Sequence, residues 1–415
     1  MWINRSLLLT ITLLLITIAA LNYSVLYYLG IDIREGIVPN LVNLFSSFCI
    51  LAIGIAATFS KRKIIVNDYT GLFVILISYT LLVSFIKNSP FEYIPSLIRF
   101  SLYFLLMVLA YNVLKVKGLE YFIKVIKVFL VFNVIFAVFF GYLEVLLGEV
   151  QFLNGAYRYS GTFKYHQLGN AMYLVVLIVL WFELFVFPKK SLLNILVLLM
   201  LSHLFVNTHS RMLFVVFLFT YCLYYLFGIK SFVKWVKITF TIGICLLGVY
   251  LAIIHTEISP RLKTVFLSEK SLKDASTNER LEIIENTFEH MIPMEVLFGI
   301  GLGGFNSFYE EATGKPNFAA HNNFLLFFTE GGLVGLILFF LYQIAVFLAL
   351  FRLARKRFLF QRKNLSRLLF VVIFIFEIGS FLLNNYYFFC SQSIVWIFIG
   401  MHVYLTKNTI YEISG

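Results

Sequence analysis

Residues 323–351 read NFLLFFTEGGLVGLILFFLYQIAVFLALF, an almost uninterrupted apolar run in which Glu330 is the single charged residue. The run exceeds the roughly 20 apolar residues that carry a helix across a lipid bilayer. Comparable runs recur along the whole chain, and 61% of its 415 residues are hydrophobic. The sequence therefore predicts an all-α polytopic membrane protein with a single integral domain, 1–415.

Lysines and arginines cluster between the apolar runs, for example at Lys61-Arg62-Lys63, Lys189-Lys190 and Arg352–Arg357. They recur at every second boundary, which is the pattern of cytoplasmic loops. Both termini are then expected to be cytoplasmic. This topology accounts for the net charge of +12, so nucleic-acid binding is not predicted.

About twelve membrane-spanning helices fit this pattern. We expect them at 7–28, 40–59, 69–86, 97–114, 121–147, 168–187, 191–207, 212–228, 236–254, 323–351, 367–384 and 388–405. The segment 255–322 is expected to form one large periplasmic loop. Within it, an S-x-x-E capping box at 276–279 precedes apolar residues at helical spacing, at Leu281, Ile284, Phe288 and Met291. This predicts a short amphipathic helix on the membrane surface or on the bundle.

A glycine-rich segment at 298–305 follows in the same loop. Its glycines could let backbone amides approach a phosphate. The segment matches neither the P-loop nor the dinucleotide fingerprint, and no strand is expected before it. A tight or flexible connector is the better interpretation.

His321 closes the loop in Ala320-His321-Asn322-Asn323, directly before an apolar run. An imidazole has an ordinary pKa near 6.5 and can take a proton from a sugar hydroxyl near neutral pH. A histidine that only bonds a backbone carbonyl at the membrane interface is the alternative. Glu330, a competing base, is expected about two and a half turns deeper along the same helix, too far into the bilayer.

Three arginines are expected on the same outward side as His321. Arg211 follows Ser210 in a short link between apolar runs, Arg280 lies in the first turn of the loop helix, and Arg158 lies between two tyrosines. Guanidinium groups bind phosphate oxygens in a bidentate manner. A solvated or snorkelling arginine is the alternative at each position.

Carboxylates that could hold a divalent metal are scarce. The chain has only three aspartates, Asp32, Asp68 and Asp274, and no D-x-D pair. We therefore predict no metal and no cofactor, with arginines neutralising an anionic, lipid-linked substrate.

These residues resemble the pattern of the O-antigen ligase / O-antigen polymerase superfamily: Ser210-Arg211 before a span, Arg280 in a long outward loop, and His321-Asn322 followed by Gly332 and Gly335. The strongest likeness covers Leu297–Phe340, and Arg158–Asn170 forms a weaker second block. The Arg-x-x-x-Leu pattern of some ligases is only approximate, because Val215 stands at the leucine position.

The resemblance implies a GT-C-like membrane glycosyltransferase in the inner membrane of a bacterium. It would transfer a glycan from undecaprenyl diphosphate to an acceptor hydroxyl at the periplasmic face, with inversion and without a metal. It implies His321, Arg211 and Arg280 as catalytic residues, and Arg158, Ser210, Asn322 and Asn323 as substrate-binding residues. The implied partners are the lipid-linked oligosaccharide donor, a lipid-anchored glycan acceptor, membrane lipids and a chain-length regulator protein.

Three functions remain open at this point. The imperfect arginine–leucine pattern favours a polymerase slightly over a ligase, which would attach the glycan to lipid A–core. The third is a flippase or other transporter of lipid-linked oligosaccharides. A transporter should place ionisable residues along a path through its spans, and Glu377 and His203 are few for that role.

Overall fold

The computed structural model describes residues 5–30, 37–59, 67–87, 90–153, 156–163, 167–208, 210–227, 236, 275–315, 320, 322–355, 363–379 and 389–413. These residues are helical apart from one hairpin and the connecting turns. The elements are α1 (Arg5–Tyr28), α2 (Ile37–Phe59), α3 (Asp68–Lys87), α4 (Pro90–Leu146), β1 (Gln151–Leu153), β2 (Ala156–Arg158), α5 (Gln167–Trp181), the π-helical turn η1 (Phe182–Val186), α6 (Leu192–Val206), α7 (Arg211–Phe227), α10 (Ala275–His290), α11 (Pro293–Phe298), α12 (Phe305–Thr313), α13 (Asn323–Arg355), α14 (Lys363–Gly379) and α15 (Phe389–Ile413).

Hydrophobic runs and helices coincide in the described part of the chain. The prediction of 69–86 corresponds to α3, and that of 191–207 corresponds to α6. Five of the described helices are long and apolar enough to cross a membrane, at Leu7–Tyr28, Asp68–Lys87, Glu92–Leu146, Gly169–Val186 and Asn323–Ala354. The chain is thus a helical membrane protein. The predicted span 236–254 lies outside the described residues except for residue 236, so the count of twelve stays a prediction.

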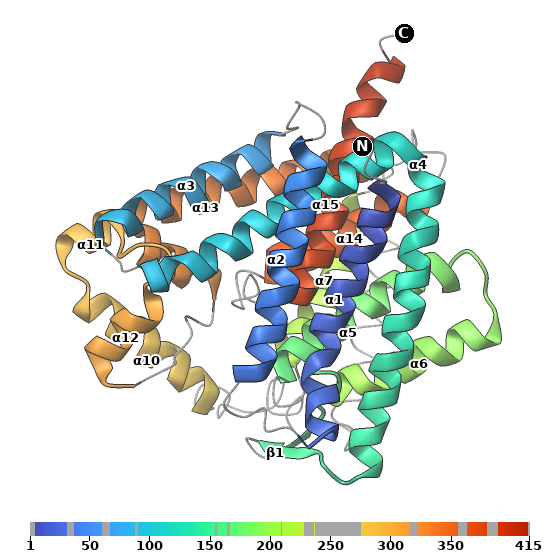
Figure 1. Cartoon of the computed structure of the whole chain (residues 1–415), viewed down its shortest axis with the longest axis horizontal. Helices are drawn as coiled ribbons and strands as arrows, with labels where there is room; N and C mark the ends of the chain where they lie inside the picture. The colour runs from blue at the N-terminus through green and yellow to red at the C-terminus, as the bar shows by residue number, and fades with distance from the viewer. Residues whose placement is uncertain are drawn as a thin grey trace.

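The helix α4 consists of two arms that meet at a corner, which is visible in Figure 1. Gly118 forms the corner with φ 79° and ψ 170°, a backbone conformation outside the helical region that suits glycine. The exposed Lys115 and Lys117 come directly before it. The two arms correspond to the separate spans predicted at 97–114 and 121–147.

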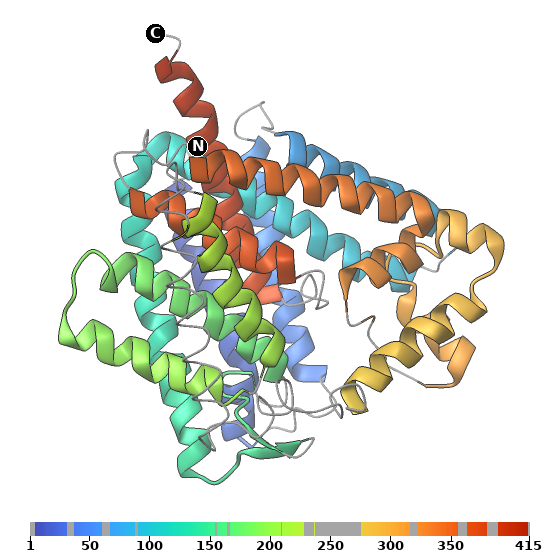
Figure 2. The same cartoon turned by 180° about the vertical axis from the view of Figure 1, so that it is seen from behind.

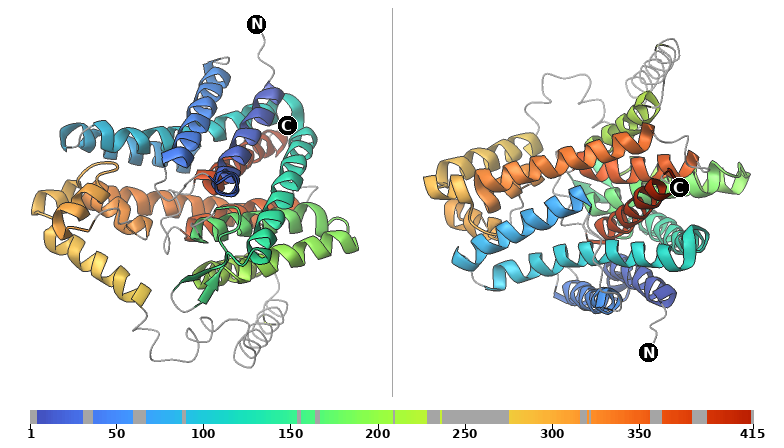
Figure 3. Two further views of the ribbon diagram at one scale, coloured as in Figure 1. Left: turned by 60° about the horizontal axis from the view of Figure 1, so that its bottom comes forward. Right: turned by 90° about the horizontal axis from the view of Figure 1, so that it is seen from above.

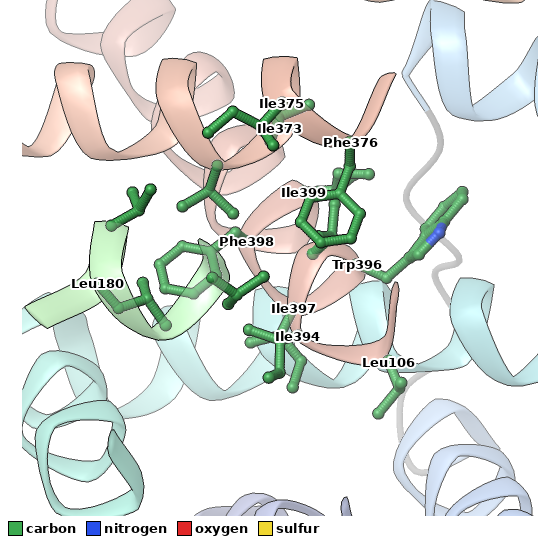
Figure 4. Close-up of a cluster of buried hydrophobic side chains, with 14 of the residues drawn as sticks. Leu106, Leu180, Ile373, Ile375, Phe376, Ile394, Trp396, Ile397, Phe398 and Ile399 are labelled. Carbon is green, nitrogen blue, oxygen red and sulfur yellow. The ribbon is translucent and has the colours of Figure 1, made fainter. Parts of the chain in front are cut away.

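The core of the bundle is formed largely by α14 and α15, which are buried around most of their circumference. A helix that is apolar all round is expected in such a central position. In Figure 4 the side chains of Phe376, Trp396 and Phe398 lie among residues of α4 and α5. The Trp396 ring also packs 4.7 Å, between centroids, from the ring of Phe73 in α3.

The helices α10, α11 and α12 gather at one end of α3 and α13, at a distance from α6 (Figures 1 and 2). The views in Figure 3 show the same group beside the long helices rather than among them. The large outward loop of the prediction therefore contains short helices, as expected. Its orientation relative to a membrane remains a prediction.

The helix α13 is not the single straight span that the sequence predicts. Gly332, with φ 60° and ψ −160°, breaks it into a short arm, residues 323–331, and a long arm, residues 332–355. The rings of Phe324 and Phe339 lie 5.1 Å apart between centroids, whereas fifteen positions along a straight helix correspond to about 22 Å. The short arm therefore folds back on the long arm.

The bend lies just beyond Glu330. The sequence places Glu330 deep along a straight span, but the chain reverses two residues later at Gly332. Glu330 lies at the end of the short arm and is fully buried. The helix is continuous from Asn323 to Glu330, so Glu330 lies about two turns from the helix start, as expected, and its depth in a membrane stays a prediction.

Candidate functional site

The short arm of α13 begins at a fixed position beside His321. Asn322 caps the helix, because its Oδ1 accepts a hydrogen bond from the backbone N–H of Leu325 at 2.7 Å. Asn323 is the first helical residue and is fully buried. His321 itself lies outside the described residues. The structure thus fixes the residues on both sides of His321, since Ala320 is also buried.

An apolar contact joins the loop helices to this helix start. We call it the outer cluster; it contains Ile283 of α10, Phe305 and Tyr309 of α12, and Ala320, Leu325 and Leu326. All six residues are buried. The outer cluster therefore holds α10 and α12 against the residues that flank His321.

Arg280 occupies the face of α10 that packs on the outer cluster. Residues three and four positions apart share a helix face, so Arg280 lies one turn before Ile283 and Ile284 on the same side. Its side chain is half-buried. The structure thus brings the helix face that bears Arg280 to the segment that contains His321.

The expected apolar stripe of α10 differs from the packed one. Ile283 and Thr287 are buried, whereas Leu281 and Phe288 of the predicted stripe are exposed. Phe288 nevertheless lies 4.9 Å from the ring of Phe328 in the short arm of α13. Ile284 packs against the outer cluster and Met291 is buried, so the predicted stripe is confirmed in part and the packed face is shifted toward Ile283 and Thr287.

The other two arginines lie on loops that contact each other. Arg158 ends β2, where it pairs with Gln151, and Arg211 begins α7 directly after Ser210. For both arginines the structure describes the backbone only. The backbone N–H of Tyr159 donates to the carbonyl of Asn207 at 3.2 Å, which ties the Arg158 strand to the loop that leads into Arg211.

A buried carboxylate organises the segment after Arg158. Glu144 of α4 accepts hydrogen bonds from the backbone N–H of Ser160 at 2.9 Å, from its hydroxyl at 2.6 Å and from the N–H of Gly161 at 2.7 Å. Gly161 has φ 48° and lies against the Asn170 side chain. The Ser-Gly-Thr part of the second sequence block is therefore structural, and sequence reasoning missed Glu144.

The glycine-rich segment is a tight connector that packs against the bend of α13. The N–H groups of Ile300 and Gly301 donate to the carbonyls of Thr329 and Glu330, both at 2.9 Å. These carbonyls lie in the last turn of the short arm, where helical partners are missing. Because both amides serve the bend, they are not available to a phosphate, and the connector interpretation is confirmed.

A buried ion pair at the opposite end of the bundle was not predicted. Arg367 of α14 donates from Nε and Nη2 to the two oxygens of Glu183 at 2.6 and 2.7 Å. Its guanidinium lies 3.9 Å from the centroid of the Phe187 ring. Glu183 belongs to the π-helical turn η1, a rare conformation that widens a helix locally. A charge inside an apolar run was the available signal, since such residues usually have a partner.

The fold and the site define a polytopic helical membrane protein in which the short helices α10 and α12 pack against the start of a bent helix. Residues 195–340, roughly a third of the chain, match the protein family described as O-antigen ligase. The resemblance to the O-antigen ligase/polymerase superfamily is thereby confirmed, and it implies a membrane glycosyltransferase of that type. The matched part includes Ser210, Arg211, Arg280 and the 321–323 segment, but not Arg158. No curated protein is similar enough to the chain to count as a match.

Proposed function

We propose that the protein transfers a glycan from undecaprenyl diphosphate to an acceptor sugar hydroxyl at the periplasmic face of a bacterial inner membrane. The observation that carries this proposal is the outer cluster, which packs the Arg280 face of α10 against the residues flanking His321 within the family-matched region. This packing supports the proposal that an anion-binding arginine of one element and a base of another act on the same substrate.

In the proposed reaction, the acceptor oxygen attacks the anomeric carbon from the face opposite the diphosphate. A new C–O bond forms, the bond to the diphosphate oxygen breaks, and undecaprenyl diphosphate leaves with the electron pair. The configuration at the anomeric carbon is therefore inverted. The proton of the acceptor hydroxyl passes to the His321 imidazole, which must be neutral to receive it.

Arg211 and Arg280 are proposed to bind the diphosphate and to stabilise the charge that develops on it. Bidentate guanidinium contacts suit this role because they need no metal ion. Arg158 and Ser210 would position the glycan. The free amide group of Asn322, whose oxygen already caps α13, and the side chain of Asn323 would orient the imidazole or bind the acceptor.

We favour a polymerase, whose acceptor is a growing lipid-linked chain and whose product length would depend on a regulator protein. A ligase that uses lipid A–core is the alternative, and the description of the matched family supports it. The imperfect arginine–leucine pattern at Arg211 and Val215 is the reason for our preference.

A transporter is the remaining candidate and is less well supported. Two of the buried carboxylates within the helices have local structural partners: Glu183 pairs with Arg367, and Glu377 accepts hydrogen bonds from Tyr342 at 2.9 Å and Gln343 at 2.8 Å. Residues satisfied in this way hold helices together rather than line a substrate path.

The test is incubation of the purified protein with a lipid-linked oligosaccharide donor and each acceptor in detergent. A polymerase yields a ladder of lengthened lipid-linked glycans, a ligase yields glycosylated lipid A–core, and both retain activity in chelator. Donor and acceptor recovered unchanged, with transport in vesicles, would identify a transporter. Loss of activity in chelator with rescue by Mg²⁺ or Mn²⁺ would contradict the arginine mechanism.

A further inference from the structure

A groove of about 590 Å³ runs between α1 and the second arm of α4. These two helices lie side by side in Figures 1 and 2. The α1 wall consists of Thr10, Leu13, Leu14 and Thr17, whose spacing places them on one helix face. The proposed transfer reaction does not involve this groove.

The groove opens on the outer surface of the bundle. Leu14, Val128 and Phe132 line it with 57%, 53% and 56% of their surface exposed, whereas Leu13 and Phe129 at its base are buried. Exposed apolar side chains of a membrane protein face lipid rather than water. The middle of the groove is therefore suited to a hydrocarbon chain.

One end of the groove is polar and positively charged. Tyr121 and Lys124 line it two turns or less from the corner of α4 at Gly118. Lys124 is exposed and makes no ion pair with any residue that the structure describes. Phe136, at the other end of the α4 wall, is apolar. The groove is thus positively charged at one end and apolar along the rest of its length, which complements a lipid with an anionic headgroup and an acyl chain.

Its length also fits a lipid. From Lys124 to Phe136 the helix rises about 18 Å, while one leaflet of the hydrocarbon core is about 15 Å thick. Basic pockets between helices at a membrane surface bind anionic headgroups. We propose that the groove is a binding site for an anionic phospholipid, with the phosphate at Lys124 and an acyl chain along Phe129, Phe132 and Phe136.

Native mass spectrometry of the full-length protein can test this site. The protein would be equilibrated in mixed micelles with phosphatidylglycerol or phosphatidylcholine, and lipid-bound species would be counted. We expect one phosphatidylglycerol to remain bound when phosphatidylcholine has dissociated. Lys124→Ala should lower its affinity about fivefold, the effect of one lysine near an anionic headgroup. Val128→Trp should block binding by filling the groove.

The matched control is Lys117→Ala, which removes one exposed lysine from the same corner of α4 but outside the groove. Unchanged phosphatidylglycerol binding in this variant supports the site, whereas an equal loss in both lysine variants would show diffuse attraction and overturn it. Equal binding of both lipids, or retained binding in Val128→Trp, would also overturn it. Undecaprenyl phosphate is added as a competitor. If it binds to the groove and phosphatidylglycerol does not, the occupant is a polyprenyl lipid and the proposal is wrong.

Discussion

The backbones of Gly299 and Gly332 are in direct contact, so that a Cβ atom built on Gly332 would be 2.5 Å from the backbone nitrogen of Gly299. Both residues have positive φ, 85° and 60°. One belongs to the glycine-rich connector after α11 and the other forms the bend of α13. The approach of two backbones at this point is what allows the short arm to reverse direction.

We predict that Gly332→Ala strongly destabilises the protein. The added Cβ meets backbone atoms that cannot rotate away, in addition to the roughly 1–3 kcal/mol cost of a backbone conformation populated essentially by glycine alone. Thermal unfolding in detergent, followed by size-exclusion chromatography, measures the effect. Gly314→Ala is the control, because Gly314 has φ 69° but no atom within 4 Å of an added Cβ. Equal losses in the two variants would mean that the contact with Gly299 contributes nothing.

The proposed base is tested at His321. His321→Ala should abolish transfer while donor binding persists, since a positioned base contributes roughly 10²- to 10⁴-fold in rate. His321→Gln keeps a hydrogen-bonding group but cannot take the proton, and should be equally inactive. In the wild type, the rate should fall as the pH drops through the imidazole pKa, ordinarily about 6.5, because the base must be neutral. An active glutamine variant would reduce the histidine to a positioning role.

Glu330 provides the accompanying control, because it is the competing base on the helix that follows His321. Glu330→Gln preserves the size of this buried side chain, and we expect substantial transfer activity to remain. Loss of activity in a variant with normal unfolding temperature and donor binding would make Glu330 the better candidate for the base.

The arginines are expected to differ from lysine in a measurable way. Arg211→Ala and Arg280→Ala should each lower the transfer rate by about 10²- to 10³-fold. The lysine variants should be less impaired, because they keep the charge but lose the bidentate geometry. Lys315→Ala is the control: it removes a cation of the same loop region that forms an exposed pair with Glu282, and should leave the rate unchanged. Wild-type rates in both alanine variants would refute the assignment.

The buried Glu183–Arg367 pair should behave as a structural unit. Glu183→Gln leaves the guanidinium without its counter-charge and should cost about 3–5 kcal/mol of stability. Adding Arg367→Met removes the stranded charge, so the double variant should unfold at a higher temperature than Glu183→Gln alone. The pair would not be coupled if the stability loss of the double variant equalled the sum of the losses in Glu183→Gln and Arg367→Met.

The expected topology can be checked by labelling single introduced cysteines. Positions Lys61, Lys189 and Arg355 should react only from the cytoplasm, because they belong to the positively charged clusters. Ser271 and Asn317 should react from the periplasm. A cytoplasmic Ser271 would place the loop on the wrong side for the proposed donor.

The sequence predicted the helices well because apolar length and the placement of lysines are local signals. The limits of α3 and α6 differ from the prediction by one residue at each end. The bend of α13 was missed because Gly331 and Gly332 lie inside an otherwise continuous apolar run. Hydropathy does not indicate whether a helix continues straight or reverses its direction. The reversal is evident only in three dimensions, from the backbone of Gly332, its contact with Gly299 and the packing of Phe324 on Phe339.

The candidate site was selected by local signals of the same kind, namely residue type and position relative to apolar runs. The roles of Arg280 and the 321–323 segment stay predictions, and the outer cluster shows only that α10 packs against the residues that flank His321. The Glu183–Arg367 pair joins residues 184 positions apart, and no sequence pattern indicates that these two residues contact each other. Long-range pairing of this kind depends on helix packing, which a single sequence does not encode in a readable pattern.

The hydrogen bonds from Ile300 and Gly301 to the short arm of α13 have a consequence for protein engineering. Chimeras that exchange the segment between α7 and α13 with a homologous sequence are an obvious way to test what this segment recognises. A graft with a junction between 303 and 329 would combine a connector from one parent with a bend from the other. Junctions should therefore lie outside 298–332, so that the donors and acceptors of the bend come from the same parent.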